Sequence, residues 1–401
     1  MPTASIHQPD SHIRLKSERL EVWGRNPASG AEEILREIPI RDLDRLILAE
    51  SVQISSPALA AVLRSGIPVS VLGWNGQFLG GFLPAANAHG LARLRQYQRT
   101  LDPDFARQMA GRIITAKVYN QRRVLQRLLA SRPTVGQASP PAGEHRDRTG
   151  IPLAPLATVG QASPPAGEQA SCLLPTPSRP PSPAAPPGPS PQSQTENQNS
   201  EIQNTLSWLD ALFHPISQSK TIDELRGYEG ASTARYFQAW SAFLPPEFPF
   251  ERRSTRPPLN AVNACISFGA TLLYNEAVAL VHAHGLDPSL GLLHYTEDGR
   301  WSLALDLIEP FRPALVEALA LDLFSHQMLD ENHFEPRNGG VYLNDDGRKK
   351  FILQYERRME RQFMSECAGH RTSLRQQLED QAVMLKAALE RPDKFEPFLM
   401  N

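Results

Sequence analysis

One histidine and two carboxylates stand out in the apolar segment GLLHYTEDGRWSLALDLIEPFRP, residues 291–313: His294, Asp306 and Glu309. An ordinary core segment does not need acids, because burying an unpaired charge is costly. The turn signal EDGR, residues 297–300, allows the chain to leave His294 and come back past it. Asp306 and Glu309 are three residues apart, so in a helix both carboxylates face the same side. The three groups are therefore predicted to meet.

Pro310 directly follows the second acid. Because proline is tolerated only in the first turn of a helix, we expect a helix to begin at these acids. A carboxylate at a helix start is also stabilised by the helix dipole, so capping and metal ligation explain Asp306 alone equally well. For His294 alone, a hydrogen-bonded, half-buried side chain is the simpler explanation. The case for chemistry therefore depends on the whole set.

A further donor comes from LRGYEGASTARYFQAW, residues 225–240, where Glu229 lies between Gly227 and Gly230. Small neighbours let a metal, a phosphate or another backbone come close, although a surface glutamate near a helix start is the simpler explanation of Glu229 alone. With Glu229, the donors are mostly oxygens plus one imidazole. Such a set suits Mg²⁺ or Mn²⁺, and the imidazole favours Mn²⁺. Zinc fits less well without a cysteine or a second histidine nearby.

A carboxylate site of this kind polarises phosphodiesters and activates an oxygen nucleophile. Basic residues follow in the same part of the chain, and charge on helices is usually just a solvated surface. Beside a carboxylate metal site, contact with phosphate is the better prediction. These residues are Arg252, Arg253, Arg256, Arg312, Arg348, Lys349, Lys350, Arg357, Arg358 and Arg361.

The elements that must position these residues fall into two groups. Residues 1–88 alternate apolar and polar side chains and carry the hairpin signal Asn75-Gly76, so they predict a β-rich domain. Residues 89–130 and 201–401 have apolar residues three and four apart, so they predict an all-α domain. We therefore expect an α+β protein with the chemistry in its helical domain.

Residues 131–200 differ from both groups, since they hold sixteen of the chain's 36 prolines. The sequence TVGQASPPAGE occurs twice in them, at Thr134–Glu144 and at Thr158–Glu168. This composition cannot bury enough apolar surface to offset chain entropy, so a disordered insertion is predicted. A tolerated surface insertion explains it better than a proline-rich docking ligand.

Composition narrows the function classes. A net charge of −2 is evidence against a polycation that coats nucleic acid, although local basic faces remain open. Cys172, Cys265 and Cys367 lie far apart without CxxC spacing, so we expect no disulfide framework and a reducing cytoplasm. No apolar run reaches the roughly 18 residues of a membrane span and the start is no signal peptide, so no membrane association is expected.

Four motifs in series strongly resemble the CRISPR-associated integrase, family one of the CRISPR-associated proteins. They are LRGYEGASTARYF, RPPLNAVNACISFGATLLYNE, GLDPSLGLLH and LALDLIEPFRP. The segments at 51–81 and 341–360 resemble the family's N-terminal domain and C-terminal helix. The resemblance covers about residues 12–131 and 201–400. The four motifs together are specific, whereas no single one is.

The resemblance implies a metal, Mg²⁺ or Mn²⁺, on Glu229, His294 and Glu309, with Asp306 as a supporting acid. It implies that a 3′-hydroxyl of a short foreign DNA duplex attacks a phosphodiester at the edge of a CRISPR repeat, which inserts a new spacer, and hydrolysis is the same chemistry with water. It also implies a homodimer and a dimeric small companion adaptation subunit. The predicted DNA contacts are Tyr236, Arg252, Arg256, Asn263 and Arg312.

The sequence departs from the family pattern in two places. Asn260 replaces an aspartate that is common after Arg-Pro-Pro, which leaves the role of that position open. The insertion at 131–200 is not a family feature, and we expect it to be harmless for catalysis. Two alternatives remain: a transposon-encoded integrase of the same family, for which we expect but do not find an added DNA-binding module, and a catalytically silent DNA-binding scaffold.

Overall fold

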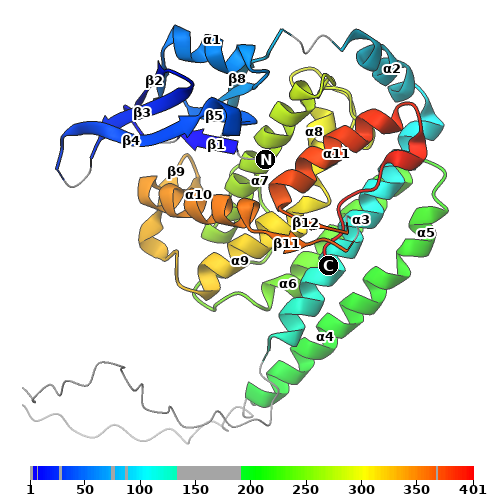
Figure 1. Ribbon diagram of the computed structural model, residues 1–401. Coiled ribbons are helices and arrows are strands. Elements are labelled where there is room, and N and C mark those ends of the chain that lie inside the picture. Colours follow the sequence, from blue (N-terminus) through cyan, green and yellow to red (C-terminus); the bar gives the residue numbers. More distant parts are fainter. Residues whose placement is uncertain are drawn as a thin grey trace, which may run out of the picture. The chain divides into compact units, whose positions relative to one another are not determined.

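The computed structural model describes residues 3–6, 8–26, 29–73, 77–85, 89–132, 191–366 and 369–401. Strands dominate its first part and helices the rest, so the predicted α+β class is confirmed (Figure 1). Residues 133–190, which hold most of the predicted insertion, lie outside the described residues. The predicted Asn75-Gly76 turn lies outside them as well.

The N-terminal strands form two four-stranded sheets, with strand orders β1-β5-β7-β8 and β4-β3-β2-β6. Strand β7 pairs antiparallel with β8, so the hairpin predicted around residues 75–76 is present. The strands are β1 (Thr3–Ile6), β2 (His12–Lys16), β3 (Arg19–Arg25), β4 (Glu32–Pro39), β5 (Arg45–Ala49), β6 (Gln53–Ile54), β7 (Val69–Leu72) and β8 (Phe78–Phe82), with a short 3₁₀ turn η1 (Ile40–Asp42) and helix α1 (Ser56–Arg64).

Alternating side chains explain why these segments form half-buried strands. In β3, Leu20 and Val22 are buried, and Ile13 of β2 joins them in a core that also receives Ala58 and Val62 of α1. This core is separate from the large apolar cluster of the helical part.

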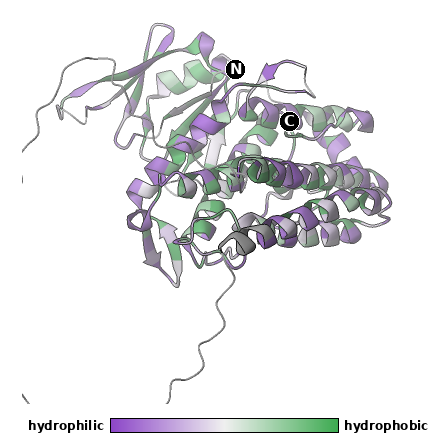
Figure 2. Cartoon of the chain, turned by 90° about the horizontal axis from the view of Figure 1, so that it is seen from below, coloured by the Kyte–Doolittle hydropathy of each residue, from purple (hydrophilic) through white to green (hydrophobic). Residues whose placement is uncertain are grey.

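The helical part is built from long amphipathic helices, and hydrophilic and hydrophobic residues alternate along them in Figure 2. The helices are α2 (Gly90–Thr100), α3 (Pro103–Ala130), α4 (Pro191–Ala211), α5 (Phe213–Ser217), α6 (Ile222–Ser241), α7 (Ala261–Ala283), α8 (Ser302–Ile308), α9 (Ala318–Ser325), α10 (Asp345–Glu360) and α11 (Leu374–Ala388). Helix α4 begins at Pro191, inside the segment 131–200 that was predicted to be the insertion. Proline fits this first position because it lacks the N–H that would have no helical partner there.

Helix α7 has the length and apolar composition of a membrane span, which the sequence interpretation overlooked. Its most apolar 18-residue window is 72% buried inside the protein, so a core position accounts for the composition. Asn260 caps this helix, because its Oδ1 accepts the N–H of Asn263 at 2.8 Å. Asparagine and aspartate are equally good N-caps, so the departure from the family pattern preserves this role.

The second part is helical, as predicted, but it also holds short strands that the sequence interpretation did not place. Strands β9 (Phe334–Arg337) and β10 (Gly340–Leu343) form a hairpin, and β11 (Phe363–Met364) pairs with β12 (Arg371–Thr372). Asn338 and Gly339 between β9 and β10 both have positive φ, +48° and +74°. That backbone is the one that Asn-Gly favours in tight hairpins, so the signal was present in the sequence.

Candidate active site

Helix α6 carries Glu229 two turns after its start at the N-cap Thr221. Its carboxylate is partly exposed, and Oε1 accepts the hydroxyl of Thr233 at 3.1 Å. A Cβ placed on Gly227 or Gly230 would meet nothing within 4 Å, so no described protein atom uses the space that these glycines leave. The flanks of Glu229 are therefore open.

Asp306 organises the loop that carries His294. It is completely buried in α8 and accepts backbone N–H groups from Leu292, Leu293 and His294 at 2.5–3.0 Å. The tight loop requires Gly291, because a Cβ there would lie 2.2 Å from the carbonyl oxygen of His294. Asp306 is thus neither a helix-start cap nor a free ligand but the anchor of the loop.

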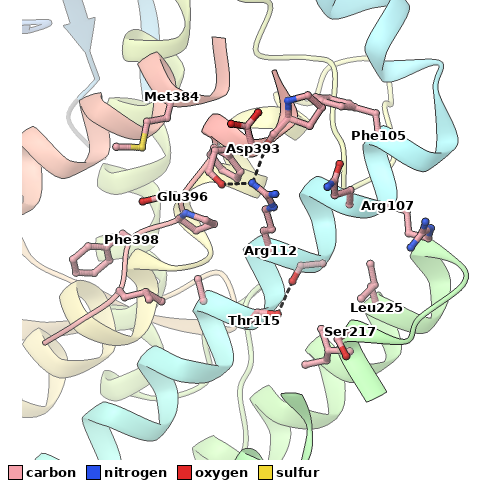
Figure 3. Close-up of a pocket in the computed structure, with 18 of the residues that line it drawn as sticks. Phe105, Arg107, Arg112, Thr115, Ser217, Leu225, Met384, Asp393, Glu396 and Phe398 are labelled. Atoms are coloured by element: carbon pink, nitrogen blue, oxygen red, sulfur yellow. Dashed lines mark hydrogen bonds between the residues drawn. The ribbon is translucent and has the colours of Figure 1, made fainter. Parts of the chain in front are cut away.

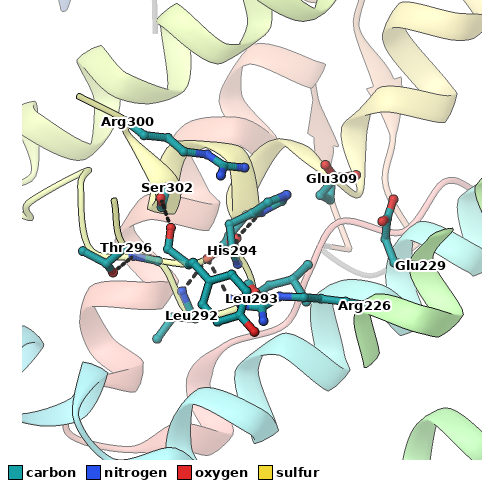
Figure 4. Close-up of polar contacts among 12 residues, drawn as sticks. Arg226, Glu229, Leu292, Leu293, His294, Thr296, Arg300, Ser302 and Glu309 are labelled. Atoms are coloured by element: carbon teal, nitrogen blue, oxygen red, sulfur yellow. Dashed lines mark hydrogen bonds and ion pairs between the residues drawn. The ribbon is translucent and has the colours of Figure 1, made fainter. Parts of the chain in front are cut away.

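The same carboxylate fixes the imidazole. His294 Nδ1 lies 2.6 Å from Asp306 Oδ1, which favours a proton on Nδ1 and leaves Nε2 as the acceptor (Figure 4). Burial lowers the pKa of His294, but the hydrogen bond and the charge of Asp306 outweigh it, so this pKa is raised. A histidine held in this way is oriented as histidine ligands of metals are.

The expected helix start at the acids is wrong, because Asp306 lies inside α8 and Glu309 is its C-cap residue. Pro310 and Pro313 lack N–H groups, so regular α-helical bonding cannot continue through them. The chain passes instead into a π-helical segment, η2 (Arg312–Glu317), before α9. A π-helical segment of this kind is often found at functional sites.

Lys117 joins the two glutamates, a role that no sequence motif indicated. Its side chain is 1% exposed, and its Nζ contacts Glu229 Oε1 and, at 2.5 Å, Glu309 Oε2. Burial raises the pKa of Glu309, but the charges of Lys117 and Arg312 outweigh it and hold this pKa at about 2. A single cation therefore already contacts both predicted ligands and helps to hold Glu309 as a carboxylate.

Arg312 continues the charged cluster. It donates from Nη1 to Glu309 Oε1 at 3.0 Å and interacts electrostatically with Glu317. Burial raises the pKa of Glu317 and of its neighbour Tyr236. Among the described residues, Glu309 Oε2, Arg312 Nε and Glu317 Oε2 are buried without a hydrogen bond of good geometry.

Helix α6 also clamps the His294 loop. Arg226 donates from Nε to the carbonyl oxygen of Leu293 at 2.7 Å, and from Nη1 to Asp223 at 2.7 Å. The guanidinium stacks on Tyr295, 3.4 Å from the ring centroid, while the Tyr295 hydroxyl donates to Asp223. Arg226 lies three residues before Glu229, so this clamp ties the histidine loop to the helix that carries the glutamate (Figure 4).

The predicted metal donors fit a divalent ion in chemistry. Glu229 and Glu309 converge on one ammonium group, and His294 interacts electrostatically with Glu309 while keeping Nε2 available. In the described part of the chain, however, no group of three His, Cys, Asp or Glu side chains stands close enough to hold a metal ion as it is. Lys117 takes the place between the glutamates.

Two residues predicted to contact DNA lie in the core. Tyr236 and Asn263 are completely buried, so neither can touch DNA in this conformation. Asn263 instead holds the preceding loop, accepting from Arg253 Nη1 and Ser254 N and donating to the carbonyl oxygen of Arg252. Membership of a motif had suggested contact, but motif position does not reveal burial.

Arg252 and Arg256 are exposed and Arg312 is partly exposed, so their predicted phosphate contacts remain open. Lys117 and Arg226 are the residues that the sequence interpretation missed. A signal existed for Lys117, because it shares the buried face of α3 with Ile113 and Ile114. A lysine on an apolar helical face calls for a buried acid.

A groove of about 1370 Å³ lies elsewhere among the described residues (Figure 3). It runs between α3 and the C-terminal segment 392–399, which Arg112 holds through the carbonyl oxygens of Pro392 and Phe395 at 2.8 and 2.7 Å. None of Glu229, His294, Asp306 and Glu309 lines it. The groove is thus separate from the carboxylate cluster.

Two curated relatives span most of the chain. The CRISPR-associated exonuclease Cas4/endonuclease Cas1 fusion of Geobacter sulfurreducens is 29% identical over 388 residues, which cover 95% of this chain and 57% of the fusion. The CRISPR-associated endonuclease Cas1 1 of Thermodesulfovibrio yellowstonii is 28% identical over 364 residues, covering 90% of this chain and 92% of that protein. The chain thus spans little more than half the length of the first relative.

Two solved structures share the fold. A partial Cas6-RT-Cas1–Cas2 complex aligns with a TM-score of 0.65 and 21% identity over 99% of this chain and 98% of that one. A casposase bound to integration product aligns with a TM-score of 0.65 and 18% identity over 97% of this chain and 90% of that one. The family model for CRISPR associated protein Cas1 matches residues 5–147 and 191–357, which is most of the sequence. The chain belongs to this CRISPR-associated Cas1 family.

Proposed function

We propose that the chain is a divalent-metal-dependent DNA integrase and endonuclease that inserts short foreign duplexes as new spacers into a CRISPR array. The observation that carries the proposal is the convergence of Glu229 and Glu309 on one cation beside an imidazole oriented by Asp306. The names of the curated relatives, which are endonucleases, support it.

The residues of the site would have separate roles in this reaction. Bound Mg²⁺ or Mn²⁺ would supply polarisation of the scissile phosphodiester and would favour an oxygen nucleophile. Glu229, Glu309 and His294 Nε2 would hold the ion, and Asp306 keeps His294 in the required tautomer. The 3′-hydroxyl oxygen of the incoming strand bonds to phosphorus while the 3′-oxygen of the target strand leaves. Arg312, Arg252 and Arg256 supply positive charge for the phosphates.

The partners follow from the same reaction. We propose a DNA duplex, a CRISPR repeat, a second copy of this chain and a dimeric small companion subunit, acting in the cytoplasm. The fold likeness to a chain of a Cas1–Cas2 complex supports the companion. Co-purification of a small dimeric protein together with a DNA duplex of defined length is the expected result, and recovery of the chain as an isolated monomer would contradict this part.

A strand-transfer assay tests the reaction. With Mn²⁺ and a duplex bearing free 3′-hydroxyls, each of Glu229→Ala, His294→Ala and Glu309→Ala is expected to lower integration about 10³-fold. Glu224→Ala, which removes an exposed acid on the same helix, is the control and keeps the activity. Undiminished integration by any of the three variants would sink the role of that residue.

A transposon-encoded integrase is the second candidate, favoured by the fold likeness to a casposase. The chemistry would be the same but the target would differ. Genome neighbourhood discriminates: a repeat array beside the gene supports spacer insertion, and flanking terminal inverted repeats support transposition. A silent scaffold is the third candidate, because Lys117 already occupies the place between the two glutamates. Absence of Mn²⁺ binding in calorimetry would favour it.

A further inference from the structure

Lys117 is a buried cation at the centre of the candidate metal site, contributed by a helix outside the four motifs. We propose that Lys117 is a built-in counter-ion that weakens the binding of free divalent metal and makes metal binding and DNA binding depend on each other. The inference rests on the proposed function, because it concerns how the same site is loaded.

The geometry gives Lys117 no ordinary surface role. It lies on the buried face of α3, and its ammonium group contacts one carboxylate from α6 and one from the end of α8. Its side chain is 1% exposed, so water does not screen its charge as it would a surface lysine. Any ion held by Glu229 and Glu309 must share these carboxylates with a fixed positive charge.

Most of the negative charge of the cluster is compensated before any metal arrives. Among the described residues, four carboxyl groups interact there, and three lysine and arginine side chains interact with them. The acids are Glu229, Asp306, Glu309 and Glu317, and the bases are Lys117, Arg253 and Arg312.

A divalent ion adds two positive charges to this cluster, which is more than the one carboxylate left without a lysine or arginine. Repulsion between the ion and Lys117 acts over a short distance in a poorly screened place, so it lowers the affinity for the ion alone. A DNA phosphate brings the negative charge that offsets the excess. Because coupling between two ligands is reciprocal, DNA should tighten metal binding by the factor by which metal tightens DNA binding.

A purely structural role for Lys117 makes a different prediction. If Lys117 only joins α3 to the two glutamates, its removal loosens the site and metal binding weakens or stays the same. If it is a counter-ion, its removal strengthens the binding of metal in the absence of DNA. The sign of the change separates the two explanations.

The experiment measures Mn²⁺ affinity by the EPR signal of free Mn²⁺, with and without a duplex ending in 3′-dideoxynucleotides, and with the duplex alone as the blank. For the unmodified chain we expect DNA to tighten Mn²⁺ binding about tenfold or more. Lys117→Met should tighten Mn²⁺ binding about tenfold without DNA and shrink the effect of DNA. Lys117→Arg keeps the charge and should keep the coupling.

Lys16→Met is the matched control, since it removes an exposed lysine paired with Glu21 and should change neither quantity. Weaker or unchanged Mn²⁺ binding by folded Lys117→Met overturns the inference. If that variant does not fold, the test uses the unmodified chain. An equal Mn²⁺ affinity of the unmodified chain with and without DNA also overturns the inference. Failure of the unmodified chain to bind Mn²⁺ even with DNA would instead overturn the proposed function, and the inference with it.

Discussion

Two buried charge clusters lie in the helical part, and they are built in opposite ways. In the first, Arg375 of α11 donates to Glu276 of α7 and to Glu356 and Glu360 of α10, at 2.9–3.4 Å. All three guanidinium nitrogens of Arg375 have carboxylate acceptors, so we call this group the saturated cluster. It joins three helices. Next to it, Arg45 interacts electrostatically with Glu276, and Nε and Nη1 of Arg45 and the Tyr355 hydroxyl are buried without hydrogen bonds of good geometry.

The second cluster, around Lys117, has similar burial but incomplete bonding. Glu229 and Glu309 share the Lys117 ammonium, and Arg312 Nε is buried without a hydrogen bond of good geometry among the described residues. Unsatisfied buried polar groups are costly, so they often mark a place that a ligand completes. We therefore expect the saturated cluster to hold the fold and the cluster around Lys117 to bind a ligand.

The largest expected effect concerns the saturated cluster. Arg375→Met leaves three carboxylates without their partner, so we expect the free energy of unfolding to fall by about 3–5 kcal/mol. Urea unfolding followed by circular dichroism measures it. The Mn²⁺ affinity of the molecules that stay folded should not change, and a large loss of Mn²⁺ affinity would break the comparison.

Acid provides the next test. The pKa of Glu309 is lowered from 4.5 to about 2 in the folded state, so it contributes stability above pH 4.5 that is lost as pH falls towards 2. In metal-free buffer, the free energy of unfolding should fall between pH 4.5 and pH 2 by on the order of 2–3 kcal/mol less in Glu309→Gln than in the unmodified chain. Burial raises the pKa of Glu356, so Glu356→Gln is the control and should not reduce this loss of stability at acid pH. Equal pH dependence of the Glu309→Gln variant and the unmodified chain would contradict the account.

The clamp on the histidine loop should have a smaller effect. Arg226→Gln frees the carbonyl oxygen of Leu293, so His294 is held less firmly and Mn²⁺ affinity should fall about 10–100-fold. Arg107→Gln is matched, because Arg107 likewise pairs with an acid three residues earlier and with a distant carbonyl oxygen. An unchanged Mn²⁺ affinity of Arg226→Gln would show that the loop carrying His294 keeps its position without Arg226.

The smallest effect is expected outside both clusters. Arg256→Gln removes an exposed arginine that we propose contacts a phosphate, so the slope of log affinity for DNA against log salt should fall by about one. Fluorescence anisotropy at several salt concentrations measures it. Arg41→Gln, on an exposed arginine beside Asp42, should leave the slope unchanged. If the slope is equal in both variants, Arg256 does not contact a DNA phosphate.

Sequence reasoning could predict the fold class and the set of acids, because periodicity and motif order are local properties. It could not predict Lys117 or Arg226, since their roles depend on which helices meet. It misassigned Tyr236 and Asn263 because a motif does not state which of its residues are buried. It also placed a helix start at Glu309, whereas two prolines three residues apart turned the helix into a π-helical segment.

The most direct test of the central claim is the anomalous difference map of crystals soaked in Mn²⁺. We predict one Mn²⁺ peak bound by the carboxylates of Glu229 and Glu309 and by Nε2 of His294, with the Lys117 ammonium moved away from the point between the glutamates. A peak at other residues, or none at saturating Mn²⁺ and DNA, would contradict the account.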